Sequence, residues 1–130
     1  MEQEFVSYEQ AVALKELGFD EDCFFIKTKD TGELLYNHSD YYDFPEEREA
    51  EIPTPLKQQV FRWFREKYGW YIELGYGLRI DFYYTIYKDS VSIAERNDYS
   101  TYEEAENACI DKLISIAKQK DNDKIQNSRS

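Results

Sequence analysis

The clearest pattern of hydrophobic and polar positions lies in the middle of the chain. Over residues 78–87 every second side chain is apolar or tyrosine, and the positions between them are polar, charged or tyrosine. Alternation with a period of two is typical of a β-strand that buries one face. With the neighbouring runs at 70–74 and 91–95, it predicts an antiparallel meander of up to three strands. One face should be apolar and the other solvated and rich in tyrosine.

Before the meander, the pattern predicts a helix and then a β-hairpin. The helix should cover residues 8–17, because Ser7 opens a capping box and Gly18 supplies the residue that ends a helix. Two short apolar runs follow at 23–29 and 33–36, separated by an Asp-Thr-Gly turn. Runs of this length around such a turn favour a hairpin.

A second helix is predicted to start after Thr54, which suits the N-cap, with Pro55 as its first residue. It should end near Tyr68, because Gly69 follows. Helical spacing places the apolar side chains on one broad arc that packs against a sheet. The residues expected on this buried arc are Leu56, Val60, Phe61, Trp63, Phe64 and Tyr68.

The last helix should begin at Thr101, with Glu104 as its reciprocal cap, and keep its apolar stripe to residues 116–118. Residues 121–130 carry one apolar side chain and predict a disordered tail. We therefore expect a single α+β domain over residues 1–120. Its order is helix, β-hairpin, helix, antiparallel β-meander, helix, with the helices packed mainly on one face of the sheet.

Charge narrows the classes of partner. The chain of 130 residues has 16 basic and 27 acidic residues, a net charge of −11. This balance opposes direct binding to nucleic acid or to an anionic membrane surface. No window is long and apolar enough to span a bilayer and the first residues do not look like a secretory signal, so we expect a cytoplasmic protein. Cys23 and Cys109 are expected to be reduced and buried.

No arrangement of side chains in the sequence indicates a catalytic centre. His38 is the single histidine, and with Asp40 and Asp43 it offers too few nitrogen or sulfur ligands for a typical zinc site. Neither cysteine has a histidine near it in sequence, and no nucleophile elbow or phosphate-binding loop occurs. We therefore expect no metal and no cofactor, and we favour a function without catalysis.

The strongest candidate for binding is the acidic irregular segment that precedes the second helix. Its carboxylates could face a protein partner that has a basic surface. The alternative is a solvated loop whose charge serves solubility alone. The candidate partner-binding residues are Asp40, Asp43, Glu46, Glu47, Glu49 and Glu51.

The second helix offers a different candidate, because it is locally basic within an acidic chain. Gln58, Arg62 and Arg65 share one face of this helix and could hold a small ligand that bears a phosphate. The same arginines could instead pair with carboxylates elsewhere in the protein.

Several segments of the chain also resemble a known group of proteins. They are residues 8–11, 14–19, 52–55, 59–68, 101–105 and 109–113. Together they are similar to small uncharacterised proteins encoded by phages and prophage-like elements of gut Bacteroidota, over roughly residues 5 to 118. The resemblance implies an accessory protein that is made inside a bacterial host, and it assigns no functional residue.

Overall fold

A computed structural model describes residues 2–36, 51–77 and 81–128. The chain divides into two compact units, residues 1–60 and 61–130, and each is described here by itself. In the described ranges, three α-helices accompany two three-stranded antiparallel sheets. This confirms the α+β class and the expected order of elements, with one further strand before the second helix. The expectation of one sheet with the helices packed mainly on one of its faces is wrong, because the hairpin and the meander belong to two separate sheets. That the two units fold as a single domain stays a prediction.

The first unit opens with the short 3-10 helix η1 (Glu2–Glu4) and the helix α1 (Tyr8–Glu16). The predicted capping box is present: Ser7 Oγ accepts from the Gln10 amide at 3.1 Å, and Gln10 Oε1 accepts from the Ser7 amide at 2.9 Å. Gly18 ends the helix with a φ of 97°, and the Phe19 amide donates to the Leu14 carbonyl at 2.9 Å. Local sequence alone accounts for both ends of α1.

The predicted hairpin is confirmed as β1 (Phe25–Thr28) and β2 (Leu34–Tyr36), and a third strand, β3 (Glu51–Thr54), pairs with the other edge of β1. The prediction that Thr54 caps the second helix is wrong. Thr54 lies opposite Phe25 in the sheet, and its hydroxyl donates to the Ile52 carbonyl at 2.9 Å. Pairing with β1 outweighs the local capping signal, and Pro53 is tolerated because β3 is an edge strand.

The helix α2 (Lys57–Tyr68) therefore begins two residues later than Pro55, the predicted first position. Four residues of the predicted arc are buried, Val60, Phe61, Trp63 and Phe64. Tyr68 is only half-buried, and Leu56 is 40% exposed, because Leu56 precedes the helix and forms an isolated bridge with Phe5. The helix ends as expected at Gly69, which has a φ of 73°.

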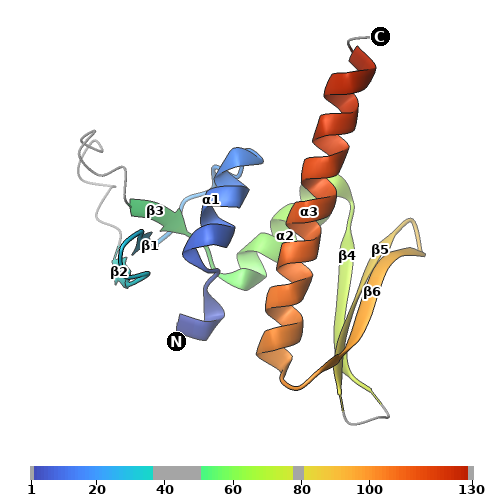
Figure 1. Cartoon of the computed structure of the whole chain (residues 1–130), viewed down its shortest axis with the longest axis horizontal. Coiled ribbons are helices and arrows are strands. Elements are labelled where there is room, and N and C mark those ends of the chain that lie inside the picture. Colours follow the sequence, from blue (N-terminus) through green and yellow to red (C-terminus); the bar gives the residue numbers. More distant parts are fainter. Residues whose placement is uncertain (1, 37–50, 78–80, 129–130) are drawn as a thin grey trace. The chain divides into compact units, whose positions relative to one another are not determined.

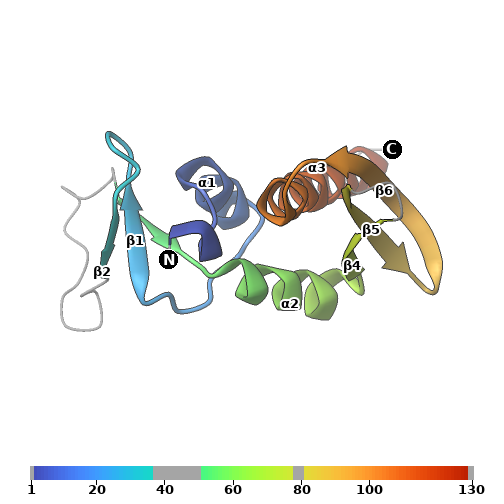
Figure 2. The ribbon, with the colours of Figure 1, turned by 90° about the horizontal axis from the view of Figure 1, so that it is seen from below.

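In the second unit, β4 (Tyr71–Tyr76), β5 (Phe82–Lys88) and β6 (Val91–Tyr99) form the predicted meander. The helix α3 (Tyr102–Ser128) lies along one face of this sheet (Figures 1 and 2). Tyr84 and Ile86 are buried on that face, as the alternation predicted. Residues 78–80 lie outside the described residues. The expected break at residues 75–77 comes later, because β4 continues through Tyr76.

The prediction that α3 ends at residues 116–118 is wrong, because the helix continues to Ser128. Thr101 caps its N-terminus as expected, because Thr101 Oγ1 accepts from the Glu104 amide at 3.1 Å, but the Glu104 carboxylate accepts from the Ser100 amide, also at 3.1 Å, instead of from Thr101. The fully buried stripe ends at Ala117, and residues 118–124 are exposed or half-buried. Extending an existing helix costs far less than starting one, so polar residues can continue it without a buried face. That residues 121–130 are mobile stays a prediction.

The two cysteines are free thiols, and they differ in burial. Cys109 on α3 is buried, as expected, and burial raises its pKa to about 12. The expectation that Cys23 is buried is wrong, because it is only half-buried in the segment before β1. Its pKa is also about 12, raised by partial burial and by the charges of Glu21 and Asp22. Both side chains are therefore protonated thiols at neutral pH.

Candidate functional site

The second sheet has one face that no other described element of its own unit covers (Figure 2). In the register of the sheet, Thr85 on β5 lies between Glu73 on β4 and Glu95 on β6. Tyrosines lie two positions to each side of Thr85 on β5, and a third lies opposite one of them on β4. We call this surface the tyrosine–glutamate face, and it comprises Tyr71, Glu73, Tyr83, Thr85, Tyr87 and Glu95.

Glu73 organises the tyrosines on this face. The Tyr83 hydroxyl donates to Glu73 Oε1 at 2.7 Å, and the Tyr87 hydroxyl donates to Glu73 Oε2 at 3.2 Å. Each hydrogen bond to the carboxylate holds the proton on the phenol, which raises the pKa of Tyr83 and of Tyr87 above the ordinary value. Both rings are thereby fixed in position, although their hydroxyls lie at the surface.

A glycine in the neighbouring strand makes this arrangement possible. A Cβ atom at Gly75 would lie 2.6 Å from the Tyr83 hydroxyl and 2.7 Å from the ring carbon that carries it. Tyr83 is the cross-strand partner of Gly75, and its ring lies over the space that a side chain would fill. The missing side chain at Gly75 therefore lets the Tyr83 ring lie across β4 and reach Glu73.

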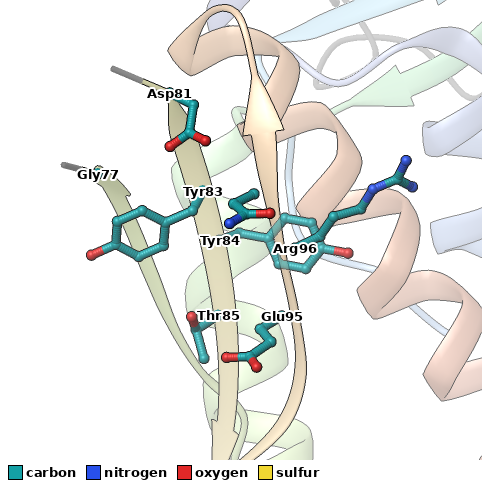
Figure 3. A pocket seen from close by; sticks show the side chains of 8 residues that line it. Gly77, Asp81, Tyr83, Tyr84, Thr85, Glu95 and Arg96 are labelled. Atoms are coloured by element: carbon teal, nitrogen blue, oxygen red, sulfur yellow. The ribbon is translucent and has the colours of Figure 1, made fainter. Parts of the chain in front are cut away.

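A pocket of about 660 Å³ adjoins this face (Figure 3). Its described lining includes Asp81, Thr85 and Glu95, so two carboxylates border it. The Arg96 side chain also contributes to the lining, but it points in the opposite direction from Tyr83 (Figure 3). Arg96 lies instead over the Tyr99 ring, with 5.7 Å between the guanidinium carbon and the ring centroid.

Exposure on the tyrosine–glutamate face falls from its edge to its centre. Tyr71 is 59% exposed and Glu95 is exposed, whereas Thr85 is only 6% exposed. The central threonine is therefore enclosed by its larger neighbours, and carboxylates and aromatic rings form the accessible surface. Such a surface can take up a cation between charged oxygens and ring faces.

Most of the acidic residues that the sequence suggested for partner binding cannot be placed. Asp40, Asp43, Glu46, Glu47 and Glu49 lie outside the described residues, as does His38. Glu51 is described, and it is a half-buried residue at the start of β3 in the first unit.

The basic candidates on α2 are all placed. Gln58, Arg62 and Arg65 are exposed, and their spacing along the helix puts them on one face, as predicted. The structure thus confirms the shared face, while a ligand for it stays a prediction.

The sequence pattern pointed to a solvated tyrosine face but singled out neither Glu73 nor Glu95. Their positions in the middle of two other strands gave no sign that they flank the same threonine, because the register between strands is a long-range property. The alternation over residues 82–87 was the one sequence pattern that indicated an exposed face of this sheet. Extending it to both neighbouring strands would have found the two glutamates.

The described residues contain neither a metal-binding group nor a membrane-spanning helix. No three side chains among His, Cys, Asp and Glu come together there as a metal-binding group. None of the helices in that part of the chain combines the length and apolarity that a membrane span requires.

Comparison with known proteins gives no assignment of family. No family model, no curated protein and no solved structure matches this chain.

Proposed function

We propose that this protein is a non-enzymatic binding protein, which holds a protein partner with a basic surface. The tyrosine–glutamate face is the part of its acidic surface that carries this proposal. The supporting observation is the row Glu73, Thr85, Glu95, in which two carboxylates flank a small enclosed residue and tyrosines stand on both sides.

The chemistry of the face suits a lysine or arginine side chain from the partner. A cation above Thr85 would meet a carboxylate on each side, and neighbouring rings would add cation–π attraction. Tyrosine is also common at the centre of protein interfaces, because it supplies a large contact area and loses few rotamers on binding. The hydrogen bonds of Tyr83 and Tyr87 to Glu73 fix both rings before a partner arrives.

The setting of this function is proposed from the resemblance to phage-encoded and prophage-encoded proteins. We propose an accessory protein that engages a host or phage protein in the bacterial cytoplasm. The acidic segment that includes Glu46, Glu47, Glu49 and Glu51 would add to the negative charge of the chain. The net charge of −11 would then speed encounter with a basic partner and keep nucleic acid away.

The test is affinity capture from an expressing bacterial cell, identification of the partner by mass spectrometry, and calorimetry with the purified pair. The double variant Glu73→Gln/Glu95→Gln should weaken binding by about tenfold or more, because two charge-assisted contacts are lost. It should also reduce the dependence of affinity on salt. Glu103→Gln, an exposed residue in the first turn of α3, is the matched control and should change little.

A second variant separates the sheet from the acidic segment. Replacing Glu46, Glu47, Glu49 and Glu51 by glutamine removes negative charge from that segment and leaves the tyrosine–glutamate face intact. A smaller loss than that of the sheet variant supports the sheet as the binding surface. A basic partner that binds all these variants as tightly as the unaltered protein would refute the proposal.

The alternative function is binding of a small phosphate-bearing ligand by Gln58, Arg62 and Arg65. Its support is that all three side chains are exposed on one helix face. Arg62→Ala and Arg65→Ala should then release a ligand that copurifies with the unaltered protein, as seen by mass spectrometry. The glutamine variants of the sheet should retain that ligand.

A further inference from the structure

Positive charge gathers at one place in the second unit, around the aromatic side chains at the end of α2. Tyr68 stacks on Trp70, with 4.4 Å between ring centroids and 15° between ring planes. Lys67 Nζ lies 5.5 Å from the centroid of Tyr68 and 4.8 Å from that of Trp63. Lys120 Nζ, from α3, lies 5.9 Å from the centroid of Tyr68. Ammonium groups from two different helices thus lie near the same tyrosine ring.

Two more lysines lie near Tyr68 and Lys120. Lys88 ends β5 directly after Tyr87, the cross-strand partner of Tyr71, so the antiparallel register puts it opposite Trp70. Lys124 lies one helical turn beyond Lys120. The pKa of Lys120 is lowered by partial burial, and then by the nearby positive charges of Lys88 and Lys124. The charge of Asp121 acts in the other direction. We call Lys67, Lys88, Lys120 and Lys124 the lysine cluster.

We propose that the lysine cluster is a binding site for a small phosphate-type anion, either free phosphate or a phosphate group on a small soluble molecule. Like charges brought into contact repel one another, and an anion between Lys88 and Lys120 would turn that repulsion into two charge-assisted hydrogen bonds. Two helices and one strand supply the ammonium groups, so the fold and not a single helix assembles the site. Cation–π contacts with the Tyr68 ring hold both Lys67 and Lys120 at the site.

The net negative charge of the chain favours a small anion at the lysine cluster over a large one. A charge is felt over about 8 Å at physiological ionic strength, so a small anion at the cluster interacts mainly with the lysines. A polyanion such as nucleic acid, or an anionic membrane, would also be repelled by the remaining charge of a chain whose net charge is −11. The site therefore favours a small anion over a macromolecular one.

This site differs from the two candidates for the main function. Its residues come from the ends of α2 and β5 and from α3, whereas the arginine face is carried by α2 alone. It also consists of lysines, whereas the tyrosine–glutamate face contains no basic residue. The proposal therefore stands or falls independently of either.

Nuclear magnetic resonance of the full chain tests the site, with inorganic phosphate and pyrophosphate as probes at constant ionic strength. Amide signals of Lys88, Lys120 and Lys124 should shift to saturation, and pyrophosphate should bind more tightly than phosphate. The Lys120 ammonium should titrate at a higher pH with the anion bound, because the anion stabilises the charged form. Vesicles that contain anionic lipid should not produce these shifts.

Variants at the cluster identify the groups that bind. Lys88→Gln and Lys120→Gln should each weaken pyrophosphate binding by about tenfold, the effect of losing one charge-assisted hydrogen bond. Lys112→Gln, an exposed lysine elsewhere on α3, is the matched control and should bind normally. Arg62→Ala should also bind normally, which separates this site from the arginine face.

The result that overturns the proposal is equally specific. Shifts that grow linearly without saturation, or that chloride reproduces, would show charge screening alone. Equal affinity in the Lys88, Lys120 and Lys112 variants would do the same. Thermal melting of each variant identifies any that fail to fold, and the remaining cluster variant then decides the question.

Discussion

The two faces of the sheet β4–β5–β6 are built from alternate residues of the same strands. On one face Tyr84 and Ile86 are 5% and 0% exposed and contribute to the core beneath α3. On the other face Tyr83 and Tyr87 donate hydrogen bonds to the exposed carboxylate of Glu73. Hydrophobic burial stabilises the first face, and on the second the accessible groups are left for recognition. Changes on the two faces should therefore separate stability from binding.

The largest expected effect is on the buried face. Ile86→Ala should lower the free energy of unfolding by about 2–5 kcal/mol, because a fully buried side chain leaves a cavity. Glu95→Gln, on the open face, should change stability by less than about 0.5 kcal/mol, the usual range for a surface substitution. Denaturant unfolding of both variants measures the difference. Equal losses would contradict the assignment of the two faces.

Alkaline pH should lower the stability of the second unit through the buried thiol of Cys109 on α3. The pKa of Cys109 is about 12 in the folded protein and 9.0 in an ordinary environment. The raised value means that the folded state holds the proton more tightly, so this stabilisation is complete below pH 9 and is lost as the pH rises towards 12. Unfolding measured across this range should show the fall, and Cys109→Ala should show less of it. An identical pH profile in that variant would refute the linkage.

A smaller effect is expected within the open face. Glu73→Gln should lower the pKa of Tyr83 and of Tyr87, because a neutral amide no longer favours the protonated phenol as the carboxylate does. Nuclear magnetic resonance of labelled tyrosines measures each titration, and Tyr71 serves as a reference residue on the same face. Unchanged values would mean that the two hydrogen bonds do not persist in solution.

Gly75→Ala tests the same contact from the neighbouring strand. The new methyl group would lie too close to the Tyr83 hydroxyl, so the flexible end of the Tyr83 side chain should turn away from Glu73. The pKa of Tyr83 should then fall while that of Tyr87 is retained, and the sheet should stay folded. A Tyr83 titration that does not change would contradict the close approach described here.

The smallest effect compares two tyrosine hydroxyls. Tyr68 Oη is buried and has no hydrogen-bond partner among the described residues, whereas the Tyr83 hydroxyl bonds to Glu73. Tyr68→Phe should therefore leave stability unchanged or raise it slightly, because it removes a buried polar group that makes no bond. Thermal melting measures the change, with Tyr83→Phe as the matched comparison. A clear loss of stability in Tyr68→Phe would reveal a partner for that hydroxyl.

The sequence by itself determined the features that depend on neighbouring residues. The capping box of Ser7 and Gln10 and the helix end at Gly18 are confirmed, because each rests on local hydrogen bonds. The alternation over 82–87 is confirmed by the buried Tyr84 and Ile86, but Thr85 on the other face is buried as well. These features fixed the α+β class and the two faces of the second sheet.

Only the tertiary structure decided which distant residues meet. The strand β3 forms because β1 offers a free edge, and this pairing overrides the local helix signal at Thr54. Register between strands brings Glu73 and Glu95 to either side of Thr85, and tertiary packing brings Lys120 of α3 to the Tyr68 ring at the end of α2. Such contacts join residues far apart in the chain, so no local pattern encodes them and only the folded arrangement reveals them.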